Sequence, residues 1–353
     1  MKVLVAMSGG VDSSVAAALM VREGHDVAGA TLKLWGGASD SGCCSVTDVD
    51  DARRVAQVLG IDHFVFNYSE EFSRHVVQPF VDDYRKGYSP NPCIECNRHL
   101  KFDLFVARAR RLGFDRVVTG HHARVLDGPR GRELFRGADV AKDQSYVLGY
   151  LGADELDVVD LPVGHWTKDH VRELAAEWNL RTWDKPDSQD VCFIESTAGR
   201  EAFLRDRFEP TPADLIDTET GDVVGAVAAA ELLTVGQRRG ITPGRHGERR
   251  FVTRVDLPSR RVEVGPLEKT LVSEVRLVDS PRVNHRIAVY SGQSILAQVS
   301  AHGEPRPGRL TEAEGQWRVV FECPERAVAV SQSVVLYDPA QPERVLGAAQ
   351  VAP

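Results

Sequence analysis

A glycine turn near the N-terminus, between an apolar strand and a helix, limits the folds open to this chain. The apolar run 3–7 ends at Ser8-Gly9-Gly10, and a helical pattern then opens near Asp12 and closes at Gly24. This order is typical of a buried parallel strand, a tight turn and a helix ended by glycine. Such a junction aims several backbone N–H groups and the positive end of the helix dipole at one point, which favours phosphate.

The side chains of the turn suit a nucleotide triphosphate. Ser8, Ser13 and Ser14 add hydroxyl donors, and Asp12 is a candidate ligand for the Mg²⁺ that accompanies a triphosphate. The turn is neither a Walker A loop nor a GxGxxG loop. The string SGGVDSS instead resembles the pyrophosphate loop of the N-type ATP pyrophosphatases, which transfer AMP from ATP to a substrate oxygen. An ordinary strand–turn–helix of small residues is the alternative.

Length and composition indicate a globular protein of several domains. A chain of 353 residues is long for one core, so we expect two or three domains. No apolar run approaches the length of a membrane span, and the run before Ser8 is too short for a signal peptide, so we expect a cytoplasmic protein. Six cysteines in a reducing compartment favour catalysis or metal binding over a disulfide scaffold.

Strands and helices alternate in the first part of the chain, which predicts an α/β fold with a doubly wound parallel sheet. The predicted strands are 3–7, 27–35, 63–66 and 116–119, and the predicted helices are 12–24, 48–59, 70–85 and 98–112. Residues 87–97 are predicted to be irregular because they contain Pro90 and Pro92. Ligands of such sheets bind at the carboxyl ends of the strands, where Gly9, Gly10 and Gly120 lie.

The pattern changes along the second half of the chain. We expect a hairpin at 124–136, helices at 145–151 and 168–178, and a loop at 182–195. Beyond Glu209 short strands surround the segment LLTVGQRRGITPGRHGERR. From Thr270 on, the alternating segments RIAVYSG, SILAQVS, WRVVFE and SVVLYD predict a small all-β barrel.

Two cysteine sites stand out. Cys93 and Cys96 form a CxxC pair in the proline-containing stretch, and Cys192 follows about a hundred residues later. Half of a zinc site is the simplest interpretation of a CxxC pair, but no second pair exists, and the nearest candidates are the adjacent Cys43 and Cys44. Cys96 precedes a predicted helix, whose dipole lowers the pKa of a thiol, so we expect a reactive cysteine. Cys323, on a predicted barrel strand, is expected to be a buried small hydrophobe.

Basic residues gather on the helix that follows the CxxC pair. They are Arg98, Lys101, Arg108, Arg110, Arg111 and Arg116. A solvated helix face is one interpretation, and a positive lane for RNA phosphate, extended by residues 142–146, is the other. The formal net charge of −8 argues mildly against nucleic acid, so local charge would have to carry such binding.

Six motifs occur together in this chain: SGGVDSS, NPCIECN followed by KF, TGHHAR, KDQSY, SQDVCFI and TVGQRRGI. Their order resembles that of the bacterial tRNA-specific 2-thiouridylases, which use ATP to put sulfur on C2 of the wobble uridine of tRNA. The resemblance runs from Met1 to about residue 350. It implies an adenine-nucleotide alpha-hydrolase-like pyrophosphatase domain over 1–205, a small central domain over 206–268 and a C-terminal β-barrel over 269–353.

The resemblance also implies site residues, each placed on the position that matches a family motif. The implied ATP contacts are Ala6, Met7, Ser8, Gly9, Gly10, Val11, Asp12, Ser13, Leu32 and Gly120. The implied catalytic cysteines are Cys96 and Cys192. The implied contacts to the target base are Asn91, Pro92 and Cys93, and those to the rest of the tRNA are His121, Lys142, Asp143, Gln144 and Gln332.

Two positions depart from the family pattern. Some members have Asp where this chain has Cys93, which leaves three cysteines able to meet around the base. Val330-Ser331-Gln332 stands where Pro-Gly-Gln is usual, which bears on the assignment of Gln332.

The implied mechanism has two stages. The C2 oxygen of uridine attacks the α phosphorus of ATP, which creates a displaceable AMP group. Cys192, loaded as a persulfide by a cysteine desulfurase or sulfurtransferase, then yields its sulfur to thiol exchange by Cys96, which leaves a disulfide for a reductant to open.

Two alternatives stay open. Cys93, Cys96 and Cys192 could hold a [4Fe–4S] cluster that delivers sulfide. The chain could also be a regulator that binds a nucleotide without catalysis, although the cysteine pair has no purpose in that reading.

Overall fold

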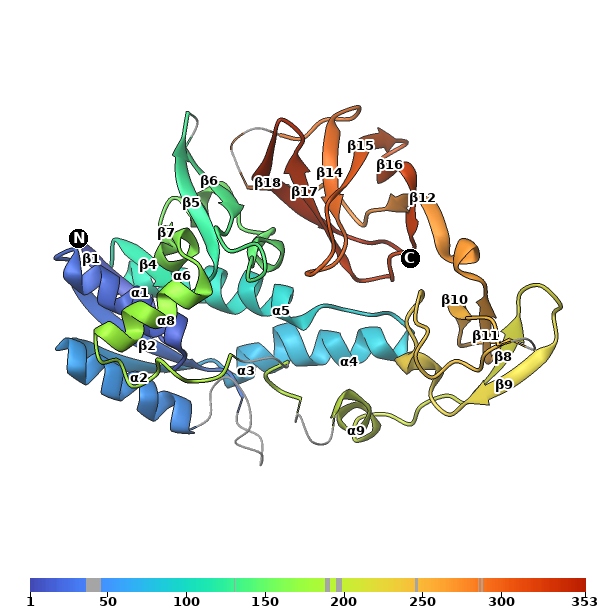
Figure 1. The fold of residues 1–353 in the computed structure, drawn as a ribbon, viewed down its shortest axis with the longest axis horizontal. Coiled ribbons are helices and arrows are strands. Elements are labelled where there is room, and N and C mark those ends of the chain that lie inside the picture. Colours follow the sequence, from blue (N-terminus) through green and yellow to red (C-terminus); the bar gives the residue numbers. More distant parts are fainter. Residues whose placement is uncertain are drawn as a thin grey trace.

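The computed structural model describes residues 1–35, 46–129, 131–187, 191–194, 199–244, 247–284, 286 and 288–353. Cys43, Cys44 and part of the SQDVCFI motif lie outside the described residues. An α/β domain and a small β-domain lie at opposite ends of the molecule, and a β-barrel rests above the helices between them (Figure 1). Among the described residues, no helix has both the length and the apolar character needed to cross a membrane.

The predicted parallel sheet of the first domain is confirmed. Its five strands run in the order β3-β2-β1-β4-β7 and comprise β1 (Lys2–Ala6), β2 (Asp26–Lys33), β3 (Asp62–Asn67), β4 (Arg116–Thr119) and β7 (Val159–Asp160). Alternate residues of β1 enter different cores: Val3 and Val5 join one apolar cluster, and Leu4 joins the other. The sheet is therefore covered on both faces, as a doubly wound fold requires.

The helices divide between those two faces. The cluster with Val3 is completed by α1 (Val11–Arg22), α2 (Val46–Leu59) and α8 (Lys168–Glu177). The opposite face is covered by two long helical runs. The first consists of α3 (Ser69–Phe72), the π-helical η1 (Ser73–Val77) and α4 (Gln78–Arg85). Helix α1 ends as predicted at Gly24, whose φ is +79° and whose N–H donates to the Val21 carbonyl at 3.0 Å.

The prediction that residues 87–97 are irregular is wrong for its second half. Helix α5 (Pro92–Glu95) begins there and continues into the π-helical η2 (Cys96–Leu104) and α6 (Phe105–Arg111). The side chain of Asn91 accepts hydrogen bonds from the N–H groups of Cys93 at 3.1 Å and Ile94 at 3.4 Å, so it caps the helix. Pro92 occupies the first helical position, where a missing N–H costs nothing.

The middle of the chain carries the predicted hairpin and a small separate sheet. The hairpin consists of β5 (Ala123–Gly128) and β6 (Gly131–Arg136). Short helices follow: η3 (Ser145–Leu148), α7 (Ala153–Leu156), η4 (Pro162–His165) and α9 (Gly199–Arg205). The small sheet has the order β10-β11-β8-β9 and comprises β8 (Ala213–Asp217), β9 (Val223–Val227), β10 (Phe251–Asp256) and β11 (Arg261–Gly265). The short helices η5 (Ala230–Leu232) and η6 (Leu267–Thr270) flank its last strands.

The C-terminal strands form the expected barrel. They run in the order β12-β16-β15-β14-β17-β18 and comprise β12 (Leu271–Arg276), β14 (Ser294–Gln298), β15 (Arg306–Ala313), β16 (Gln316–Arg326), β17 (Ser333–Asp338) and β18 (Gln341–Gln350). An antiparallel bridge between Leu277 and Val351 closes the ring. The short β13 (Arg282–Val283) lies off this strand order and pairs antiparallel with β18.

One expected barrel strand is wrong. The described residues of the segment RIAVYSG form no strand, because the chain there turns toward β14. Tyr290 is 64% exposed in this turn, and Gly292 adopts a φ of +91°.

The barrel is joined to the first domain through the hairpin. Strand β18 pairs with β6 at Arg344 and Phe135, so the sheet of the barrel continues into the hairpin. This junction has no signal in the sequence, because the two strands are far apart along the chain.

Candidate active site

The glycine turn after β1 has the backbone geometry of an anion site. Gly9 has a φ of +74°, and a Cβ there would collide with the backbone oxygen of Asp48, so only glycine fits. Gly10 is the extended N-cap of α1. The first N–H groups of a helix have no partner within it, so those of α1 are directed at this turn.

Two of the three serines hold the turn together. Ser13 Oγ accepts from the N–H of Ser8 at 3.2 Å and donates to the Gly10 carbonyl at 3.1 Å. Ser14 Oγ donates to the same carbonyl at 2.8 Å. These hydroxyls therefore shape the turn. Ser8 is exposed, and its hydroxyl lies 3.3 Å from Ser13 Oγ.

Other predicted nucleotide residues converge on the turn. Gly120, just after β4, packs so closely on α1 that a Cβ would lie 2.5 Å from the N atom of Ser13. Leu32 lies buried near the carboxyl end of β2, the neighbour of β1. The turn, Leu32 and Gly120 thus share one edge of the sheet.

Asp12 is already paired within the protein. Its two carboxylate oxygens lie 2.7 and 2.6 Å from Lys168 Nζ, and His122 Nε2 lies 3.0 Å from the first of them. Burial alone would raise the pKa of Asp12, but His122 and Lys168 outweigh burial and lower it. In the part of the chain that the structure describes, no three His, Cys, Asp or Glu side chains form a metal-holding group, and the predicted Mg²⁺ ligand Asp12 is bound by Lys168 and His122.

Lys168 belongs to a larger ion-pair cluster. Asp187 accepts from Lys168 at 2.9 Å, from Lys142 at 2.8 Å and from Arg172 at 2.9 Å. Burial opposes ionisation of Asp187, but the bonds from Lys142 and Lys168 lower its pKa to about 2. Lys142, predicted to contact tRNA, is therefore one carboxylate away from the lysine that holds Asp12.

A second lysine contacts the turn itself. Lys185 Nζ donates to the carbonyl of Gly9 at 3.0 Å, to Asp48 at 2.6 Å and to Asp51 at 2.8 Å. Burial works against its charge, but the two carboxylates raise the pKa of Lys185 above its ordinary value. Lys185 is therefore charged and lies against the turn.

Sequence reasoning missed both lysines, as well as His122 and Asp187. His122 and the Lys185–Asp187 stretch border assigned motif residues, so their proximity to a motif was a usable signal. Lys168 had none, since only the fold brings α8 beside α1.

Three of the predicted tRNA contacts, His121, Asp143 and Gln144, are engaged within the protein in this structure. Asp143 accepts from the N–H groups of Gly137 and Ser145 at 2.9 and 3.0 Å, and Gln144 Oε1 accepts from the His122 N–H at 2.8 Å. His121 is buried, and burial lowers its pKa well below the ordinary value. These three side chains stabilise the loops around the turn.

The two implied catalytic cysteines pack on one apolar cluster. Cys96 is 7% exposed in that cluster, and Cys192 is half-buried against it. Phe193 anchors the short stretch with Cys192 by packing on Phe80 and Phe203, with ring centroids 5.2 and 5.1 Å apart. Cys96 thus lies inside the helical run rather than before its start.

The exposure and arrangement of the other described cysteines test two of the predictions made from the sequence. Cys93 is exposed beside Cys96, and Cys323 is also exposed, so the expectation that Cys323 is buried is wrong. Cys93, Cys96 and Cys192 are all described and form no metal-holding group. The arrangement of these three cysteines therefore does not favour the [4Fe–4S] alternative, and Cys43 and Cys44, the further ligands considered for zinc, lie outside the described residues.

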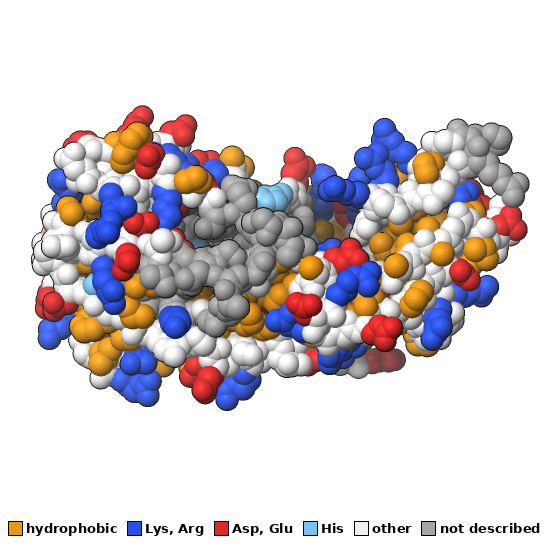
Figure 2. Space-filling view, turned by 90° about the horizontal axis from the view of Figure 1, so that it is seen from below, with side chains coloured by type: hydrophobic (Ala, Val, Ile, Leu, Met, Phe, Trp, Pro, Cys, Tyr) orange, Lys and Arg blue, Asp and Glu red, His pale blue; other side chains and the backbone are white. Residues whose placement is uncertain are grey.

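Most arginines of the predicted basic helix contact their own domain. The guanidinium of Arg98 lies 5.2 Å from the Tyr150 ring, and that of Arg108 lies 4.1 Å from the Phe66 ring. Arg110 donates to the Asp154 carbonyl at 2.9 Å. On the face drawn in Figure 2, acidic and basic side chains are interspersed rather than gathered by sign.

Gln332 contacts the loop before the cysteines. Its Nε2 donates to the carbonyl of Ser89. Ser331 has a φ of +68°, in the left-handed region that favours glycine. The chain therefore keeps a glycine-like backbone where Pro-Gly-Gln is usual.

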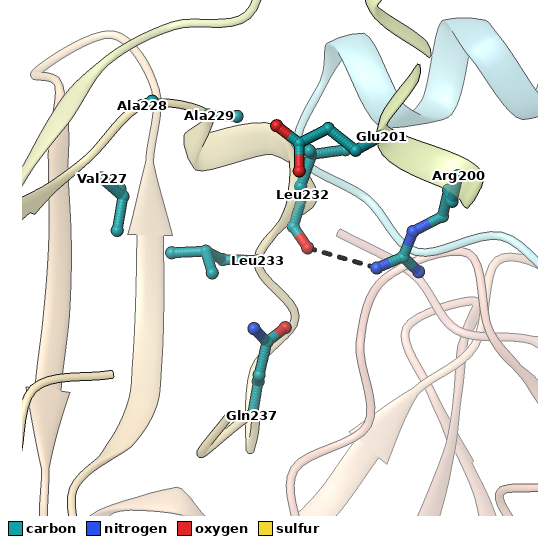
Figure 3. Close-up of a pocket in the computed structure, with 8 residues that line it drawn as sticks. All are labelled: Arg200, Glu201, Val227, Ala228, Ala229, Leu232, Leu233 and Gln237. Atoms are coloured by element: carbon teal, nitrogen blue, oxygen red, sulfur yellow. Dashed lines mark hydrogen bonds between the residues drawn. The ribbon is translucent and has the colours of Figure 1, made fainter. Parts of the chain in front are cut away.

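A separate hollow lies between α9 and the small β-domain (Figure 3). It measures about 430 Å³ and is lined by Arg200, Glu201, Val227, Ala228, Ala229, Leu232, Leu233 and Gln237. Arg200 there donates to the Leu232 carbonyl at 3.5 Å. None of the predicted site residues lines this hollow.

Comparisons with known proteins cover the whole chain. Family models match in succession: the tRNA methyl transferase HUP domain at residues 1–196, the tRNA methyl transferase PRC-barrel domain at 201–266 and the aminomethyltransferase beta-barrel domain at 274–351. The tRNA-specific 2-thiouridylase MnmA of Chloroflexus aurantiacus is 43% identical over 99% of this chain and 98% of its own. The protein of that name from Frankia casuarinae is 43% identical over 99% of both chains. A solved 4-thiouridine synthetase–RNA complex with bound ATP is 16% identical over 54% of this chain and 44% of its own, with a TM-score of 0.37.

Proposed function

The chain belongs to the tRNA-specific 2-thiouridylase family, and we propose that it uses ATP to replace the C2 oxygen of the wobble uridine of tRNA by sulfur. The observation that carries this proposal is the glycine turn at Gly9 and Gly10, to which the same fold adds Lys168 and Lys185. An ordinary strand–turn–helix does not need two lysines held at its turn by carboxylates.

Activation of the base would take place at the turn. The N–H groups of the turn and the first turn of α1 would hold the β and γ phosphates of ATP. Lys168, which is paired with Asp12, and Lys185, which donates to the Gly9 carbonyl, would place their ammonium groups beside these phosphates. The C2 oxygen of uridine attacks the α phosphorus, pyrophosphate leaves, and C2 then carries a displaceable AMP.

Sulfur would arrive through the cysteines. A sulfur-donor protein would load Cys192 as a persulfide, and the Cys96 thiolate would attack Cys192 Sγ, with the outer sulfur as the leaving group. This attack releases HS⁻ and forms the Cys96–Cys192 disulfide. HS⁻ adds to C2 and expels AMP, and an external thiol must then reduce the disulfide. The target uridine would have to leave the anticodon stack to reach Cys93 and Asn91.

The decisive experiment supplies the purified protein with tRNA, ATP and a persulfide donor. We expect pyrophosphate release that depends on tRNA, and 2-thiouridine in the nucleosides obtained by digesting the tRNA. Pyrophosphate release without thiolated nucleoside would contradict sulfur transfer. ATP binding with no pyrophosphate release in the presence of tRNA would instead support a nucleotide-binding regulator.

A further inference from the structure

Ser89 joins three parts of the molecule at one buried point. Its side chain and backbone are only 4% exposed. Its N–H donates to the Val330 carbonyl at 3.0 Å, and its carbonyl accepts from Gln332 Nε2. Its hydroxyl lies 2.9 Å from the hydroxyl of Thr234. All polar groups of this one residue are therefore bound by the barrel and the small β-domain.

The position of Ser89 in the chain gives these bonds a consequence. Ser89 is separated by Pro90 alone from Asn91, which caps the helix that carries Cys93 and Cys96. The unusual backbone at Ser331 directs the Val330 carbonyl and the Gln332 side chain at Ser89 together. The entry to the cysteine helix is therefore fixed from outside its own domain.

Thr234 is itself rigidly held, as part of the TVGQRRGI motif, for which sequence reasoning found no role. Its carbonyl accepts from the Gln237 N–H at 2.9 Å, and its N–H donates to Gln237 Oε1 at 3.3 Å. The Gly236 N–H of the same turn donates to the Val252 carbonyl of β10 at 2.8 Å. This turn therefore transmits the position of the small sheet to Ser89.

We propose that Ser89 is a positioning residue for the thiolation reaction, which sets the cysteine helix against both distal domains through its bond to Thr234. The inference rests on the proposed function. A displacement of about 1 Å of a reacting group can cost about 100-fold in rate, so a single inter-domain bond at the base of this helix can control the step. The residue touches no reacting atom and acts through the placement of Cys93 and Cys96.

The test removes one or the other hydroxyl of the Ser89–Thr234 hydrogen bond. Ser89→Ala and Thr234→Val each delete the bond, while Thr234→Ser keeps it. Tyr337→Phe is the control, because it deletes a different inter-domain hydroxyl contact, 3.0 Å from Ser145, in which neither partner belongs to the helix that carries Cys93 and Cys96. We expect both deletions to lower the kcat of thiolation about 10-fold with unchanged KM for ATP, and Thr234→Ser and Tyr337→Phe to stay within about twofold of the wild type.

Two further measurements keep the proposal separate from stability and from the proposed function. The double variant Ser89→Ala/Thr234→Val should be no slower than either single one, because both remove the same bond. Peptide-resolved alkylation needs no activity: Cys96 should react several-fold faster in the two deletion variants, with the exposed Cys323 as internal reference. Unchanged kcat and unchanged Cys96 alkylation in the deletion variants would overturn the positioning role. So would an equal loss of kcat in Tyr337→Phe. A wild type that thiolates nothing would overturn the proposed function, and the alkylation rates would still decide whether Ser89 positions the helix.

Discussion

Lys168 Nζ on α8 donates hydrogen bonds to both carboxylate oxygens of Asp12 on α1, at 2.7 and 2.6 Å. Asp12 lies in the first turn of α1, directly after the glycine turn. The Lys168 side chain is only 8% exposed, so the pair is largely desolvated. The pair is neutral overall, and it fixes the position of the Lys168 ammonium group beside the phosphates that the turn would bind.

Asp12→Asn should lower tRNA-dependent pyrophosphate release by about 100-fold, because Lys168 and His122 lose the carboxylate that orients them. Release is measured by a coupled pyrophosphate assay on folded protein. Asp115→Asn is the control, since Asp115 accepts a bond from the backbone N–H of Lys2 on the exposed surface. Near-normal release by the Asp12 variant would remove Asp12 from the ATP site.

Cys96→Ser and Cys192→Ser should each abolish thiolation while pyrophosphate release continues, because adenylation of the base needs neither thiol. Cys93→Asp should retain thiolation, since the described cysteines form no cluster-holding group. The readouts are nucleoside mass analysis and pyrophosphate release on the same samples. Thiolation at a near wild-type rate by either serine variant would make that cysteine structural. If Cys93→Asp lost both thiolation and bound iron, the result would support the [4Fe–4S] cluster hypothesis.

Ser331 is expected to tolerate glycine better than a branched residue. Its φ of +68° is strained for any side chain and most strongly for a β-branched one. Ser331→Val should lower the free energy of unfolding by about 1–2 kcal/mol, and Ser331→Gly should change it by less than about 1 kcal/mol. Urea unfolding measures both. Equal stabilities would show that the loop relaxes out of the left-handed region.

His99 should make stability depend on pH. Asp103 and Glu95 hydrogen-bond its ring and raise its pKa to about 9, against the ordinary 6.5. Since the folded pKa is higher, the stabilisation is complete below about pH 6.5 and is lost as the pH rises through about 9. The His75 ring stacks on His99 at 5.0 Å, and burial lowers the pKa of His75, so the stack pairs a neutral with a charged ring near neutral pH. In His99→Gln, the midpoint temperature of thermal unfolding should depend less on pH between pH 6.5 and 9 than it does in the wild type. An unchanged slope would place the pH dependence elsewhere.

Binding of tRNA should be electrostatic and local. We expect log affinity to fall linearly with log salt, with a slope that reports several phosphates. Arg238 and Arg239 are exposed next to the turn that binds Ser89, whereas Arg108 is engaged by Phe66. Reversal of Arg238 and Arg239 to Glu should therefore weaken binding and flatten the slope more than reversal of Arg108 and Arg111. The opposite ranking would restore the basic helix as the RNA path.

The parallel sheet, the glycine turn and the barrel could all be predicted from the order of residues along the chain. These follow from local causes: apolar runs that end at glycine, helical periodicity, and short segments of alternating apolar and polar residues bounded by Gly and Pro. The same order also places the turn and Gly120 at one sheet edge, since parallel strands share their carboxyl ends.

Which charged side chains meet depends on the packing of distant segments. Lys168 and Asp12 are separated by more than a hundred residues, and only the packing of α8 on α1 joins them. The same holds for Ser89, whose partners lie in two other parts of the fold. Prolines at 90 and 92 predicted an irregular loop, but Asn91 supplies the cap that lets Pro92 begin a helix, and Cys96 is buried as a result. Local patterns record what a segment can form, whereas long-range ion pairs and hydrogen bonds depend on which segments the core brings together.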